Sequence, residues 1–205
     1  MSDWEKCIHE ICTITRDTKE PDNRSVNANY RKNRPQNMRK PGYAVLWLMC
    51  GVKDGVKTVL QIGINKSLER MFKNDLNFDR RYIIKGLRSA DDSNDEKKPT
   101  SRPKSYKKAG ADLRKNKYDS LIFYELDINE YLKDDYVLKY LLAPGSPQDE
   151  KLTEVYYYIT ASYAEGKLAR ETKAEYWNPS GGIDGDVYDY YRSSAPADSS
   201  AGRNS

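Results

Sequence analysis

The chain has 205 residues, of which 38 % are hydrophobic and 32 % are charged, and its formal net charge is +4. This length allows one domain with a proper core, and the polar composition indicates that some segments lie outside that core. No apolar run is long enough to cross a bilayer, and the three cysteines form no CxxC pair. The sequence therefore favours neither a membrane span nor a zinc or disulfide framework, and a reducing, cytoplasmic setting fits it best.

The first forty residues are expected to form a short helix and a basic arm. Ile8, Ile11, Cys12 and Ile14 would give the helix an apolar edge. Residues 18–40 are rich in Asn, Arg and Pro, as loops are. We therefore assign 1–40 to an N-terminal helix and arm that precede the main domain.

Strands are predicted over 43–52 and 56–63, followed by a helix. The first strand is a continuous apolar run, and "KDG" at 53–55 is a hairpin turn signal before "VKTVLQIG". Ser67 is a plausible N-cap for a helix from Leu68 to about Leu76. Its inner side would carry Leu68, Met71, Phe72 and Leu76.

The second half of the chain adds a third strand and several helices. Residues 88–108, with prolines at 99 and 103, indicate a charged, exposed insertion. A short helix from 109, a turn near Asn116 and a strand at 121–126 follow. Helices are predicted over 128–142 and 150–174, the latter with a buried side of Leu152, Val155, Tyr156, Ile159 and Tyr163.

This order predicts a small α+β domain over 41–192, with a three-stranded antiparallel sheet flanked by helices. The tail, 193–205, is rich in Ser and Ala and is expected to be disordered.

Two basic stretches suggest a nucleic-acid partner. Residues 24–40 carry six basic residues and no acid, and residues 97–117 carry nine against one acid, Asp112. Clustered Lys and Arg favour a phosphate backbone through counterion release. Two alternatives remain open: the stretches are solvated loops, or the acidic stretch 125–154 makes a protein-contact surface.

Six motifs in order resemble the GIY-YIG nuclease family over about 41–185. "PGYAVLW" is similar to the first strand motif, "LQIG" (60–63) to the second, and "NKSLERMFKND" to the arginine helix. "DLRKNKYDSLIFYELD" is similar to the segment that contains the third strand, "TEVYYYITASY" to the glutamate helix, and "WNPSGG" to the closing asparagine segment.

The resemblance implies a metal-dependent endonuclease that cleaves duplex DNA with Mg²⁺ or Mn²⁺. Glu154 would hold the metal, Arg70 would clamp the scissile phosphate, and Tyr43 would be the strand tyrosine. Glu165 is the alternative ligand, because eleven residues bring it to the same helix face as Glu154. Nucleic-acid contacts are expected from Gln61, Lys66, Arg102, Lys104, Lys107, Lys108 and Asn178.

Three departures from the family pattern keep a second hypothesis open. Ala44 occupies the first tyrosine position, Gln61 replaces the second tyrosine, and Arg70 lies one residue early, about 100° around a helix. The alternative is a catalytically degenerate module that binds nucleic acid or protein without hydrolysis. Either hypothesis is compatible with a homodimer, and both place Glu154 at the sheet end that carries Tyr43 and Arg70.

Overall fold

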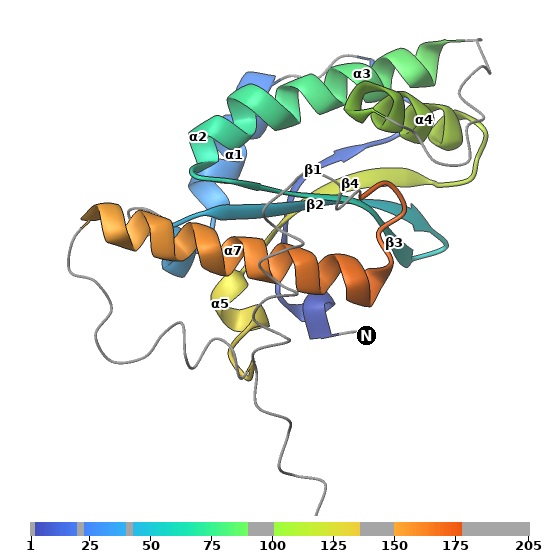
Figure 1. Ribbon diagram of the computed structural model, residues 1–205. Coiled ribbons are helices and arrows are strands. Elements are labelled where there is room, and N and C mark those ends of the chain that lie inside the picture. Colours follow the sequence, from blue (N-terminus) through green and yellow to red (C-terminus); the bar gives the residue numbers. More distant parts are fainter. Residues whose placement is uncertain (1–2, 20–22, 40–42, 90–100, 136–149, 178–205) are drawn as a thin grey trace, which may run out of the picture.

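The computed structural model describes residues 3–19, 23–39, 43–89, 101–135 and 150–177, with side chains from 156 onward in the last range. The described residues form an α+β fold in which helices cover both faces of a four-stranded sheet (Figure 1). The α+β class is thus confirmed, and the sheet has one strand more than predicted.

All strand pairs in the sheet are antiparallel. The strands are β1 (Ile8–Ile14), β2 (Val45–Lys53), β3 (Val56–Asn65) and β4 (Ser120–Leu126), in the order β1-β4-β2-β3. The central strand β2 is buried from Val45 through Gly51, because helices cover both of its faces. The β2–β3 hairpin turns at Asp54 and Gly55, whose φ values of 49° and 78° are those of the turn that a "DG" pair favours.

The predicted N-terminal helix is wrong, because residues 8–14 form β1 along the edge of β4. The pairing register shifts between Glu10 and Cys12, which leaves Ile11 as an extra, unpaired residue. This bulge interrupts the alternation of the strand and gives its apolar residues the spacing of a helix.

One face of the sheet is covered by α1 (Asn23–Asn33), α2 (Leu68–Arg70), the π-helical segment η3 (Met71–Leu76), α3 (Asn77–Arg88) and α4 (Arg102–Arg114). A short 3-10 helix, η2 (Gln36–Arg39), follows α1. Ser67 caps α2 as predicted, since its Oγ accepts a hydrogen bond from the Arg70 N–H at 3.3 Å. We call α1, α3 and α4 the basic layer, because these helices carry exposed Arg and Lys side chains.

Two loop predictions on this face need correction. Residues 18–40 contain α1 and η2 rather than only an arm. Of the expected insertion, Arg88 ends α3 and residues 102–108 begin α4, while 90–100 lie outside the described residues.

The glycines Gly86 and Gly110 bring α3 and α4 into backbone contact. A Cβ at Gly86 would lie 2.0 Å from the Lys107 carbonyl oxygen, and one at Gly110 would lie 2.0 Å from that of Ile83. Since Arg102 pairs with Asp79 while Gly110 packs between Ile83 and Leu87, the two helices run parallel and end side by side.

The other face is covered by η1 (Asp3–Lys6), α5 (Ile128–Tyr131) and α7 (Glu150–Thr172). The long predicted helix is confirmed, and Tyr163 is buried as expected, whereas Tyr156 and Ile159 are only half-buried. The side chains of Leu152 and Val155 lie outside the described residues, and Tyr157, Ala161, Ala164 and Leu168 also pack against the sheet. The predicted helix 128–142 is described only as far as 135, and α5 ends at Tyr131.

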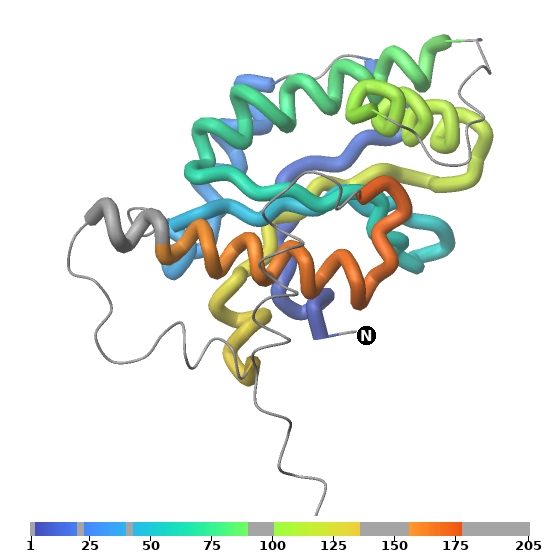
Figure 2. Tube along the Cα trace, viewed as in Figure 1, coloured from blue at the N-terminus to red at the C-terminus, as the bar shows by residue number. Residues whose placement is uncertain are grey.

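After α7 the chain turns back to the sheet (Figure 2). The Glu175 N–H donates to the Val59 carbonyl at 3.1 Å, and the Tyr176 N–H donates to that of Leu60 at 2.7 Å. This segment therefore covers part of the β3 edge.

Candidate nucleic-acid interface

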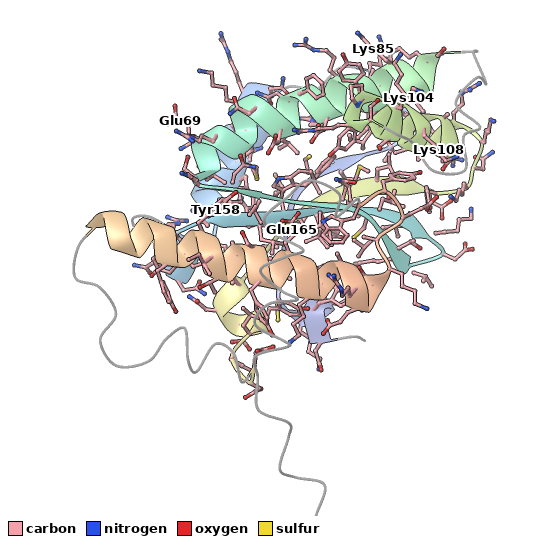
Figure 3. The ribbon with its side chains drawn as sticks, in the orientation of Figure 1. Glu69, Lys85, Lys104, Lys108, Tyr158 and Glu165 are labelled. Atoms are coloured by element: carbon pink, nitrogen blue, oxygen red, sulfur yellow. The ribbon has the colours of Figure 1, made fainter. Side chains whose placement is uncertain are left out.

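The outward side of α3 carries a row of cations. Arg81, Lys85 and Arg88 are exposed, and their spacing of four and three residues places them on one helix face. On α4, Lys104 is exposed and Lys107 and Lys108 are half-buried. Lys85, Lys104 and Lys108 lie on the two neighbouring helices of this layer (Figure 3). The outward sides of α3 and α4 thus carry two neighbouring rows of cations.

The acids of α3 and α4 are buried. The Asp79 carboxylate is fully buried and accepts hydrogen bonds from Arg102 Nε and Nη2, both at 3.0 Å. Burial raises the pKa of Asp79 to about 7, and the nearby Arg102 guanidinium opposes that shift. Asp112 is 8 % exposed and accepts from the Tyr176 hydroxyl at 3.1 Å and from Lys117 Nζ at 3.3 Å. Within these two helices, both fully described, no carboxylate is exposed.

Helix α1 adds exposed cations, and a buried cation, Arg34, directly follows it. Arg24, Arg31 and Lys32 are exposed, and the Arg31 guanidinium lies 5.8 Å from the Phe72 ring centroid on η3. Arg34 is buried instead, with Nε 2.9 Å and Nη2 2.6 Å from the two carboxylate oxygens of Glu125. The first basic stretch is therefore divided between surface and interior.

Tyr43 is buried, and its hydroxyl is hydrogen-bonded to the start of α5. It is 4 % exposed, and its hydroxyl accepts from the Ile128 N–H at 3.2 Å and donates to Asp127 Oδ1 at 3.4 Å. Burial and the Asp127 carboxylate raise the pKa of Tyr43 above its ordinary value. Asp127 is also the N-cap of α5, so the hydroxyl fixes the start of that helix. Ala44, where the resemblance would require a tyrosine, is buried in the core.

The residues of the second strand motif, 60–63, also contact the protein rather than extend into solvent. Gln61 is half-buried, and its Nε2 donates to the Ile62 carbonyl at 3.4 Å. A Cβ at Gly63 would lie 2.6 Å from Cζ2 of Trp47, so the indole fills the space above this glycine. The close Trp47 indole explains why a glycine stands at this point of β3.

The expected proximity of Arg70 and Glu154 stays a prediction, because the structure does not describe the Glu154 side chain. Arg70 is exposed on α2. The chain then continues into η3 and α3, which pack in the core on that face of the sheet. Glu154 belongs to α7, the helix that covers the opposite face of the sheet (Figure 1). In the next turn of α7, the rings of Tyr157 and Tyr158 lie 5.3 Å from the Tyr43 ring centroid and 5.7 Å from Lys66 Nζ, respectively. The Glu154 side chain and the whole of Asn178 lie outside the described residues.

Glu165, the alternative metal ligand, is 4 % exposed and accepts from Trp177 Nε1 at 3.2 Å. Tyr158 lies on the same side of α7, two turns earlier, with its ring centroid 5.7 Å from Lys66 Nζ. The part of the chain that the structure describes contains no group of three His, Cys, Asp or Glu side chains that could hold a metal ion. Of the two predicted metal ligands, only Glu165 has a described side chain, and its carboxylate accepts a hydrogen bond from an indole N–H.

The predicted binding cations have different surroundings. Arg102 is paired with Asp79 and Asp75, and Lys108 Nζ lies 3.7 Å from Asp112, whereas Lys66 and Lys104 are exposed. Sequence analysis missed Arg81, Lys85 and Arg88, although their helical spacing was visible within "DRRYIIKGLR".

Comparison with protein-family models, with curated proteins and with solved structures found no significant match. The search of the described residues for a helix able to span a membrane also found none.

Proposed function

We propose that the protein binds nucleic acid through the basic layer, with duplex DNA as its ligand. The observation that carries the proposal is the sorting of charge on α3 and α4. Their acids, Asp79 and Asp112, are buried and hydrogen-bonded, while Arg81, Lys85 and Lys104 are exposed. The layer therefore offers positive charge without an exposed carboxylate on either helix.

Duplex DNA is the polyanion that this arrangement suits best. It carries one negative charge per roughly 1.7 Å of its axis, and each phosphate that is neutralised releases condensed counterions. Lys and Arg side chains that reach from two neighbouring helices can contact several phosphates without reading bases. The expected binding is therefore independent of sequence and sensitive to salt.

Fluorescence anisotropy with a labelled duplex of random sequence tests this proposal. The informative variant is Arg81→Gln with Lys85→Gln, which removes two exposed cations from α3. Its matched control is Lys6→Gln with Lys133→Gln, which removes two cations from exposed ion pairs on the opposite layer. We expect weaker binding for the first variant and unchanged binding for the control. Equal affinities for both variants and the unsubstituted protein would remove the basic layer as the binding surface.

Hydrolysis of the bound strand is the second candidate function. It is favoured by the side of α7 that carries Glu165 and Tyr158, because Lys66 lies against the Tyr158 ring there. Supercoiled plasmid incubated with Mg²⁺ or Mn²⁺ tests it. Glu165→Gln is the suitable variant, since an amide oxygen can still accept from Trp177. Nicking by the unsubstituted protein that is lost in Glu165→Gln would support hydrolysis, and an intact plasmid throughout leaves binding alone.

A further inference from the structure

Two half-exposed aromatic rings lie among the cations of α3. Phe78 and Tyr82 are about one helical turn apart, and their ring centroids are separated by 4.6 Å with the planes tilted by 48°. Arg81 is three residues from Phe78, and Lys85 follows on the outward side of the helix (Figure 3). Aromatic rings and exposed cations are therefore neighbours on this part of the basic layer. We call Phe78 and Tyr82 the aromatic platform.

Each ring of the platform also lies close to a cation. The Arg102 guanidinium, from α4, lies 5.4 Å from the Phe78 ring centroid, and Lys85 Nζ lies 5.0 Å from that of Tyr82. A cation at this distance is attracted by the negative charge on the ring face. The contacts thus form one series, from Arg102 through Phe78 and Tyr82 to Lys85.

The two ends of this series differ in freedom. Arg102 is fixed, because it donates to Asp79 at 3.0 Å and lies 2.7 Å from a carboxylate oxygen of Asp75. Lys85 is exposed, and its four-carbon chain is flexible. Its Nζ can therefore move from the Tyr82 ring to a phosphate, which opens that ring to another flat group.

Core packing accounts for only part of this arrangement. Tyr82 packs partly against the core on this side of the sheet, whereas Phe78, within the described part of the chain, packs against neither core cluster. No carboxylate is exposed on α3 or α4, so the surroundings favour an anionic partner over an apolar protein segment. Nucleic acid combines anionic phosphates with flat rings, and an unpaired base can stack on an aromatic side chain.

We propose that the aromatic platform stacks on unpaired bases, so that the preferred ligand of the basic layer is DNA with a single-stranded segment. The proposal rests on the proposed function, because the surrounding cations hold the phosphates while a base lies on Tyr82. It adds a preference for unpaired strands to backbone binding. Such stacking tolerates any base, since every base has a flat face.

Two labelled strands of equal length provide the test: an oligothymidylate and an oligomer of abasic sugar phosphates. They carry the same charge, and only the first carries bases. We expect the unsubstituted protein to bind the oligothymidylate about tenfold more tightly, which corresponds to roughly 1.4 kcal/mol and to one stacked base.

The ring variant is Tyr82→Leu, and Tyr82→Phe is its conservative counterpart because it keeps the ring. Tyr82→Leu should bind both strands equally with an unchanged salt slope, whereas Tyr82→Phe should keep the preference for bases. Phe78→Leu gives a second ring variant with the same expected loss if Tyr82→Leu does not fold. The matched control is Arg81→Gln with Arg88→Gln, which removes two exposed cations and leaves both rings. It should weaken the binding of both strands equally and reduce the salt slope.

Three results would overturn the platform and leave general backbone binding intact. They are equal binding of the two strands by the unsubstituted protein, binding of the random duplex alone, and a preference for bases that both ring variants keep. If neither strand nor the duplex binds, the proposed function fails and the platform fails with it.

Discussion

Replacing Arg34 by Met should destabilise the fold severely, because it leaves the Glu125 carboxylate without its main partner. Glu125 is fully buried in β4, and Arg34 holds both of its oxygens, at 2.9 and 2.6 Å. Among the hydrogen-bond partners in the described part of the chain, the Tyr30 hydroxyl, 2.5 Å from Oε2, would remain. Two charge-assisted hydrogen bonds contribute about 1.5–3 kcal/mol each, and breaking a buried ion pair costs about 3–5 kcal/mol. That loss is a large share of the roughly 5–15 kcal/mol by which domains are stable.

Urea denaturation followed by circular dichroism measures this loss. The matched control is Lys32→Met, an exposed position in the last turn of α1, two residues before Arg34, where we expect a change within about 0.5 kcal/mol. The double variant Arg34→Met with Glu125→Leu should recover most of the stability, since it removes both charges. A loss below about 1 kcal/mol in Arg34→Met would refute the reasoning, because Glu125 would then have found another partner or water.

Three further stability changes follow from particular contacts. Gly86→Ala should lower the free energy of unfolding by about 1–3 kcal/mol, because the new Cβ would meet the Lys107 carbonyl. Alanine normally favours a helix interior over glycine, so a variant that is more stable in thermal or urea unfolding would contradict the close crossing of α3 and α4. Because burial raises the pKa of Asp79 to about 7 from 3.8, its proton stabilises the folded state fully below about pH 4, and this contribution is lost as pH rises through 7. The free energy of unfolding should therefore fall over that range more steeply in the unsubstituted protein than in Asp79→Asn, and parallel pH profiles would contradict the shift. Ser67→Ala should cost about 1 kcal/mol through the lost N-cap hydrogen bond of α2, whereas Ser101→Ala, at the N-cap of α4 where the side chain makes no cap hydrogen bond, serves as the near-neutral control; equal losses for the two variants would contradict the cap.

The central strands could be predicted because their apolar runs and turn residues carry local information. The "DG" pair fixes the β2–β3 hairpin, and continuous burial follows from the run Val45–Cys50. The edge strand β1 could not be predicted in this way, since the bulge at Ile11 gives it helical spacing. Its strand conformation depends on β4, whose edge it completes from more than a hundred residues away in the sequence.

The candidate site was predicted in its charge but not in its geometry. The basic composition of 97–117 was visible, yet only the structure shows that Arg102 is paired with a buried Asp79. Tyr43 looked like a projecting strand tyrosine, but its hydroxyl binds the start of α5. Such outcomes depend on partners far along the chain, which a local motif cannot identify.

The salt dependence of DNA binding tests the central claim most directly. The cations that the basic layer exposes or half-exposes on α3 and α4 include Arg81, Lys85, Lys104 and Lys107. If about four of them contact phosphates, a plot of log K against log salt concentration should have a slope of about −3 to −4. Arg81→Gln with Lys85→Gln should reduce the magnitude of that slope by about two. A slope near zero, or one that this variant leaves unchanged, would contradict binding through the basic layer.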